Sequence, residues 1–84
     1  MMTERMIYKI IGQRVREYRI ARQLTQEEIS EKLQMSRPSI TNIESGKHRI
    51  QIHVLYELAK LFDIPIQNLV VIVCDNENQN AIVV

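Results

Sequence analysis

This 84-residue chain has none of the long apolar runs that cross a membrane, and its first residues do not resemble a secretory signal. It has one cysteine, Cys74, so no disulfide can form within the chain. A lone cysteine suits a reducing compartment, because stabilising disulfides form in oxidising ones. We therefore expect a cytoplasmic protein with no membrane partner, made of one small domain with a modest core.

Residues that could perform catalysis or hold a cofactor are also scarce. The sequence offers no Ser-His-Asp grouping, no phosphate-binding glycine loop and no carboxylate pair in surroundings that would raise a pKa. His48, His53 and Cys74 are the residue types that bind metals most readily, but no two of them have the spacing of a ligand pair. We expect neither an enzyme nor a protein that needs a metal or cofactor.

Charge is nearly balanced overall, at +1, but it is unevenly distributed along the chain. Residues 1–50 contain ten Lys and Arg against six Asp and Glu, whereas residues 51–84 contain one against four. A basic front and an acidic back suit a protein that meets phosphates on one side only.

The stretch from Thr25 to Gly46 reads TQEEISEKLQMSRPSITNIESG and predicts two short helices with a three-residue break. Thr25 and Glu28 have the spacing of a capping box, which predicts a helix over 26–33. Ser36 is a second N-cap and Pro38 suits a first turn, so a further helix is predicted over 37–45, closed by Gly46. Two such helices form a helix-turn-helix, whose second helix can lie in a DNA major groove.

This stretch resembles the lambda-repressor-like, or Cro-like, helix-turn-helix domains. The segments LTQEEISEKL and SRPSITNIESGK carry the resemblance, which extends from about Ile11 to Leu69. It implies a DNA-binding protein with a mostly α-helical, five-helix fold. Relatives usually have glycine where Gln34 stands, so Gln34 must adopt a positive φ or the break must form a different turn.

The remaining predicted elements flank the motif. Thr3 caps a helix that starts at Glu4, continues through Gly12 and closes at Gln23-Leu24. Apolar periodicity predicts a helix over 52–62, with a poor N-cap at its start, and Pro65 predicts a short fifth helix over 66–70.

The last residues differ from the rest in composition. Residues 70–74 and 81–84 are β-branched runs, and the residues between them, 75–80, are polar. They predict either a C-terminal β-hairpin or a frayed tail. We divide the chain into a DNA-binding domain over 1–69 and a tail over 70–84, which is a candidate dimerisation segment.

The outward face of the second motif helix is the predicted base-reading surface, formed by Arg37, Pro38, Ser39, Thr41 and Asn42. Arg37 can donate two hydrogen bonds to the O6 and N7 of a guanine, and Asn42 can pair with an adenine. A solvated helix face is the alternative, and the flanking motif favours readout. Contacts to DNA phosphates are expected beside this face, partly by the resemblance, at Thr25, Gln26, Ser45, Lys47 and Arg49.

Arg19 and Glu44 are predicted to form a structural ion pair. Each lies on the core-facing side of its helix by periodicity, where an unpaired charge is costly. The resemblance implies the same pair between the first and third helices.

The leading hypothesis is a sequence-specific transcriptional regulator of a bacterium or phage, acting as a homodimeric repressor on a palindromic site in double-stranded DNA. One alternative is an antitoxin, or another protein-interaction module with the same fold, which covers a protein partner. Another is the controller protein of a restriction-modification operon. Dimerisation is expected through the fifth helix and the tail, because helices 1–4 use their apolar faces for the core.

Overall fold

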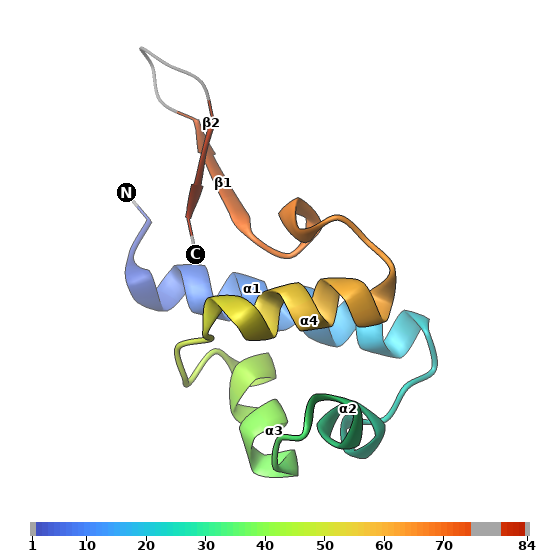
Figure 1. Cartoon of the computed structure of the whole chain (residues 1–84). Coiled ribbons are helices and arrows are strands. Elements are labelled where there is room, and N and C mark those ends of the chain that lie inside the picture. Colours follow the sequence, from blue (N-terminus) through green and yellow to red (C-terminus); the bar gives the residue numbers. More distant parts are fainter. Residues whose placement is uncertain (1, 75–79, 84) are drawn as a thin grey trace.

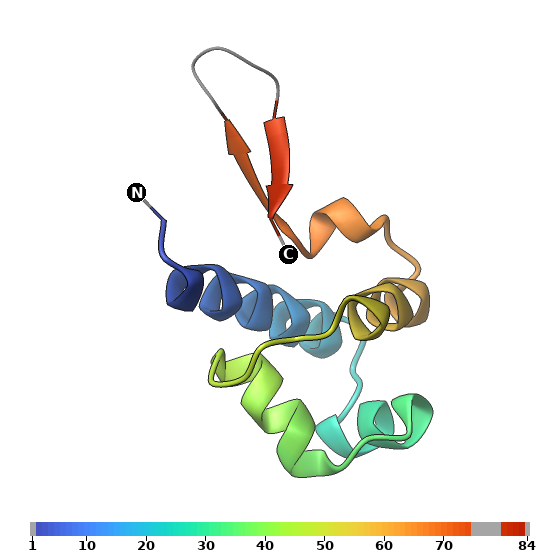
Figure 2. The ribbon, with the colours of Figure 1, turned by 60° about the vertical axis from the view of Figure 1, so that its left-hand side comes forward.

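The computed structural model describes residues 2–74 and 80–83 (Figure 1). Within them the α-helices are α1 (Glu4–Ala21), α2 (Gln26–Leu33), α3 (Arg37–Ser45) and α4 (Ile52–Phe62). A 3₁₀ turn, η1 (Ile66–Asn68), leads to strands β1 (Val71–Cys74) and β2 (Asn80–Val83), which pair antiparallel. Two views show α1 and α4 in the middle of the molecule, α2 and α3 on one side of them, and the strands on the other (Figures 1 and 2).

The expected architecture, a five-helix domain completed by a hairpin or strand tail, is wrong. The described residues contain four α-helices, and the segment expected as the fifth is only the turn η1. Pro65 has no N–H to donate, and Val71 is already extended, so the backbone turns once between them. The two described strands lie beyond this helical body, and most of the turn predicted over 75–80 lies outside the described residues.

The helices begin where local capping residues predict. Thr3, Thr25 and Ser36 each accept a hydrogen bond from the backbone N–H three residues later. At Thr25 the capping box is complete, because the Glu28 carboxylate accepts from the Thr25 N–H at 3.0 Å. Gln51, before α4, makes no such side-chain bond, as expected for a poor cap.

Every α-helix ends in the same way, at a residue in the left-handed region: Gln23 (φ 57°), Gln34 (φ 55°), Gly46 (φ 77°) and Asp63 (φ 57°). The N–H of the residue after each of these bonds back to the carbonyl five positions earlier, as in a Schellman motif. This closure ends α1 at Ala21, earlier than the predicted Gln23-Leu24. It also shows that Gln34 takes the positive φ rather than a different turn.

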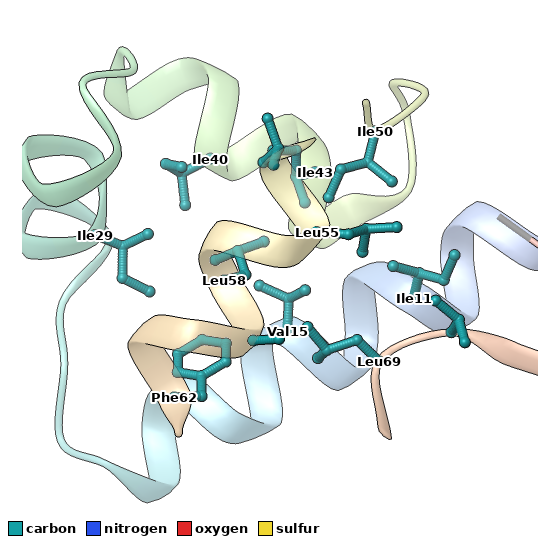
Figure 3. Packing of buried hydrophobic residues seen from close by; sticks show 13 residues of the cluster. Ile11, Val15, Ile29, Ile40, Ile43, Ile50, Leu55, Leu58, Phe62 and Leu69 are labelled. Carbon is teal, nitrogen blue, oxygen red and sulfur yellow. The ribbon is translucent and has the colours of Figure 1, made fainter. Parts of the chain in front are cut away.

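The core lies between α4 and the other three helices (Figure 3). Its apolar side chains are at most 7% exposed, and they are Ile11, Val15, Ile29, Ile40, Ile43, Ile50, Val54, Leu55, Leu58, Ala59, Phe62, Leu69 and Val70. The last two attach the root of the C-terminal segment to the helical body. Arg14 of α1 reinforces this attachment by donating to the Val70 carbonyl.

Gly12 fixes how closely α1 crosses α3. A Cβ atom at this position would lie 2.2 Å from the Ile43 carbonyl oxygen and 2.8 Å from that of Glu44. No side chain fits there, so only glycine allows α1 to run unbroken past the end of α3 at this distance.

Among the described residues, no helix is both long enough and apolar enough to span a membrane.

Candidate nucleic-acid interface

The orientation of α3 follows from which of its residues are buried. Ile40, Ile43 and Glu44 face inward, so Arg37, Thr41 and the rest of the opposite side face solvent. The start of α2 lies beside this exposed side, and both helices lie at one end of the molecule, opposite the strands (Figure 1). The sequence-predicted reading helix is therefore presented outward.

Arg19 and Glu44 form the ion pair that holds α3 against α1. The Arg19 Nε donates to one Glu44 carboxylate oxygen at 2.7 Å, and a terminal nitrogen of the same guanidinium donates to the other at 3.1 Å. The two side chains are only 13% and 4% exposed. Arg19 also donates to the Leu24 carbonyl at 2.9 Å, so it ties the α1–α2 connection to the same pair. This two-pronged geometry is strong and directional.

Gln26 links this buried pair to the exposed face of α3. Its Nε2 donates to the Glu44 carboxylate at 3.1 Å, and its Oε1 accepts from the Thr41 hydroxyl at 2.9 Å. A continuous chain of hydrogen bonds thus runs from Arg19 through Glu44 and Gln26 to Thr41. These hydrogen bonds orient the Gln26 amide and use only one of its two N–H groups.

The predicted base-reading residues are not all equally placed. Arg37, Pro38, Thr41 and Asn42 line one shallow hollow on the outer side of α3. Ser39 is not part of this lining, because its hydroxyl lies 2.8 Å from the Ser36 hydroxyl at the helix cap. The structure therefore gathers four of the five predicted residues and turns the other towards the cap.

The predicted phosphate contacts are also placed differently from one another. Lys47 is exposed, while the Thr25 hydroxyl is engaged in capping α2 and the Ser45 hydroxyl donates to the Asn42 carbonyl at 3.1 Å. Arg49 forms an exposed ion pair with Glu4 of α1, with the Arg49 Nη2 2.8 Å from the Glu4 carboxylate. That partner is 45 residues away in sequence and was not predicted.

A basic hollow is a second feature that sequence reasoning missed. It lies between the start of α1 and the loop after α3, and its lining residues include Arg5, Lys9, Lys47 and Arg49. Arg5 and Lys9 are four apart and share one side of α1, which the sequence could have indicated. Nothing local indicates that this side meets the loop after α3, because that depends on the close crossing at Gly12.

The capping box of α2 also acts on the ionisation of Glu28. The Thr25 backbone N–H, and to a smaller extent the Thr25 hydroxyl, interact with the Glu28 carboxylate and lower the pKa of Glu28 from its ordinary value of 4.5.

In the described part of the chain, no three His, Cys, Asp or Glu residues lie close enough together to hold a metal ion.

Helix caps, an outward second helix and a fixed three-residue break define a DNA-binding helix-turn-helix protein of the lambda-repressor type. Residues 12–71 match the family model described as "Helix-turn-helix domain", and the chain belongs to that family.

Relatives and solved structures agree with this assignment. An uncharacterized HTH-type transcriptional regulator of Archaeoglobus fulgidus is 34% identical over 56 residues, covering 67% of this chain and 80% of that protein. The restriction-modification controller protein C.AhdI of Aeromonas hydrophila superposes with a TM-score of 0.70 at 29% identity, over 74% of this chain and 94% of that one. The DNA-binding domain of BldD gives a TM-score of 0.69 at 26% identity, over 81% and 97%. The chain is thus a helix-turn-helix transcriptional regulator by family.

Proposed function

We propose that this protein is a sequence-specific repressor that binds a palindromic operator in duplex DNA as a homodimer. One observation carries the proposal: the Gln26 amide fixes the start of α2 against the exposed face of α3 through Glu44 and Thr41. In helix-turn-helix docking, these two elements meet a DNA backbone and the adjacent major groove. A reading helix held rigidly to a backbone-contacting helix suits selective binding.

Roles follow for the side chains on this surface. Arg37 would read a guanine, and Thr41 and Asn42 would contact neighbouring bases, with Pro38 against a thymine methyl group. The N-terminal N–H groups of α2 and the Lys47 ammonium would hold phosphates and so set the register of α3 in the groove. The protein would repress by occupying the operator and so excluding polymerase.

The dimer would form through the C-terminal segment, residues 70–84. One reading helix contacts only a few base pairs, so two copies about 34 Å apart on one DNA face give the needed selectivity. A two-stranded hairpin is marginal alone, and β1 and β2 pair with each other at an end of the molecule remote from α3. Pairing there with a second copy leaves both α3 helices free for DNA, so residues 1–69 would bind DNA and residues 70–84 would assemble the dimer.

A controller protein of a restriction-modification operon is the second candidate. The similarity in fold and sequence to C.AhdI, a restriction-modification controller protein, favours it. A further controller protein, C.Esp1396I, was solved as a tetramer in complex with its natural 35 base-pair operator, and it matches in fold at 21% identity with a TM-score of 0.62. A controller would use the same surface but could activate as well as repress.

Selection from a pool of random duplexes tests the leading proposal. We expect enrichment of an inverted repeat whose half-sites lie about one helical turn apart. The enriched site placed in a promoter upstream of a reporter then gives the sign of regulation: a plain repressor only lowers expression, whereas raised expression would favour the controller. Enrichment of no duplex, or only of sites without two-fold symmetry, would contradict a dimeric operator-binding protein.

A further inference from the structure

The basic hollow borders the reading face and extends it onto α1. It is lined by Glu4, Arg5, Tyr8 and Lys9 from α1 and by Ser45, Gly46, Lys47, His48 and Arg49 from the end of α3 and its following loop. Ser45 is exposed on the outer side of α3 and is also part of this lining, so the two surfaces are continuous. Figure 1 shows the loop after α3 lying beside the N-terminal part of α1.

Backbone contact holds these two segments together. A Cβ atom at Gly46 would lie 2.6 Å from the Lys9 Cα, and Gly46 has a φ of 77°. Further along α1, the crossing at Gly12 is closer still, with a Cβ atom there lying 2.2 Å from the Ile43 carbonyl oxygen. The α1 backbone that carries Arg5 and Lys9 is therefore fixed relative to α3.

The hollow has a strong charge bias. Arg5, Lys9, Lys47 and Arg49 bring four cationic groups to it, against the single carboxylate of Glu4. Arg5, Lys9 and Lys47 are exposed, and none of them forms an ion pair within the described residues. Arginine and lysine in such an arrangement bind phosphodiester oxygens, arginine through its two-pronged donors and lysine as a point charge.

We propose that the DNA-binding surface continues from α3 onto the first two turns of α1, where Arg5 and Lys9 contact backbone phosphates of duplex DNA beside the bases that α3 reads. Glu4 competes with those phosphates for Arg49, through the ion pair seen in the free protein. The inference rests on the proposed function and adds to it a second backbone contact and an acidic competitor.

Because Glu4 competes with DNA for Arg49, removing its charge should strengthen DNA binding. The Glu4–Arg49 pair is exposed, at 61% and 76%, so it contributes little to folding stability. Removing the Glu4 charge should leave the fold intact and free Arg49 for a phosphate. Loss of an acidic residue is then expected to tighten binding through one named arginine, rather than through net charge alone.

Titration of the full-length protein with its selected operator, measured by fluorescence anisotropy at several salt concentrations, tests this. The duplex carries about ten extra base pairs on each side, one helical turn. Arg5→Ala and Lys9→Ala should each weaken binding about threefold to tenfold and reduce the slope of log K against log salt by about 0.9 for each protomer, about 1.8 for the dimer. Lys60→Ala is the matched control, because Lys60 is an exposed lysine of α4 that lines a different hollow.

Glu4→Gln should tighten binding by about threefold or more and steepen the slope by about 0.9 for each protomer, about 1.8 for the dimer, relative to Glu17→Gln. Glu17 is an exposed carboxylate elsewhere on α1. In an Arg49→Ala background, Glu4→Gln should lose its advantage over Glu17→Gln. Gains that persist in that background would reject Glu4 as a competitor for Arg49.

The inference would be overturned if Arg5→Ala and Lys9→Ala bound the operator with the same salt slope as Lys60→Ala. The proposed function would still stand in that case, because selective operator binding would be retained. Absence of selective duplex binding by the unmodified protein would overturn both.

Discussion

Arg37 is the residue with the longest reach on the exposed side of α3, and its guanidinium matches the two acceptors of a guanine edge. Arg37→Ala should cost about 1–3 kcal/mol of binding free energy on the best operator and relax the preference at one base pair in each half-site. Binding to the selected operator and to single-base variants measures both effects.

Lys47→Ala is the comparison for Arg37→Ala, because Lys47 is exposed beyond the end of α3. If Lys47 contacts a phosphate, its loss should weaken binding to all sequences alike and lower the salt slope by about one unit per contact, and so by about two units for the dimer. Equal losses of Arg37→Ala on operator and random DNA would mean that Arg37 contacts only the backbone.

The buried pair of Arg19 and Glu44 should behave as a unit. Arg19→Met alone should lower the free energy of unfolding by about 3 kcal/mol, because it leaves the Glu44 carboxylate buried without its charged partner. Adding Glu44→Leu should recover much of this loss. Recovery should be incomplete, because the Gln26 amide then loses its acceptor. Urea denaturation of both single variants and the double variant measures the coupling, and strictly additive losses would exclude it.

Periodicity was enough to predict the Arg19–Glu44 pair, because it places each of these charged residues on the apolar, core-facing side of its helix, where a charge needs a partner. It could not predict that Gln26 bridges Glu44 and Thr41, or that Arg49 pairs with Glu4, since Gln26, Arg49 and Glu4 lie outside the apolar helix faces, where a polar side chain needs no partner. Such contacts depend on how helices cross, and one-dimensional patterns carry no crossing angle. The same limit applies to Arg5 and Lys9, whose position beside the loop after α3 depends on how α1 crosses α3.

At the scale of elements, the helix ends should be improvable. Three of the four left-handed closing positions hold Gln23, Gln34 and Asp63, which have a Cβ that disfavours this conformation. Gln34→Gly should be neutral or raise the free energy of unfolding by up to about 1 kcal/mol. Gln23→Gly should act similarly, and Asp63→Gly should gain less because aspartate tolerates the region better. Denaturant melts measure this, and a clear loss at Gln34 would contradict the left-handed turn.

The capping box of α2 should give the stability of the protein a pH dependence. The pKa of Glu28 is lower in the folded state, so its stabilising effect is present above the ordinary value of 4.5 and is lost as the pH falls through the folded-state pKa. Thr25→Ala removes the hydroxyl that interacts with the Glu28 carboxylate and should raise the pKa of Glu28 towards its ordinary value. Carboxyl carbon NMR titration follows this directly, with Glu27 as an internal reference on the same helix. An unchanged Glu28 titration in the variant would contradict a contribution from the Thr25 hydroxyl.

Local chemistry explains why the bounds of α2, α3 and α4 were predictable while those of the chain's end were not. Capping residues and Gly46 mark the ends of α2 and α3, and a strong apolar periodicity marks α4 although its start has no side-chain cap. The segment after Pro65 has a valid helix start but no capping or periodic signal to show where it stops. Burial of Leu69 and Val70 against the helical body, followed by extended β-branched residues, limits it to one 3₁₀ turn.

At the scale of the whole molecule, assembly and DNA affinity should be separable from folding. Deleting residues 71–84 retains Leu69 and Val70, including the Val70 carbonyl that Arg14 contacts. The shortened protein should keep its helical circular dichroism, become a monomer and bind the operator much more weakly. Sedimentation is the decisive measurement. A shortened protein that still dimerises, or a full-length protein that is monomeric at about 10 μM or above, would contradict assembly through this segment.

The absence of a side chain at Gly12 has a thermodynamic consequence for recognition. Because the α1 backbone lies directly on the carbonyls of Ile43 and Glu44, α3 has no looser position to explore before it meets DNA. The entropy of ordering the reading helix is then lost during folding and not during association. Calorimetry of operator binding should show a heat-capacity change that matches the contact surface alone, and not the greater change that accompanies coupled folding.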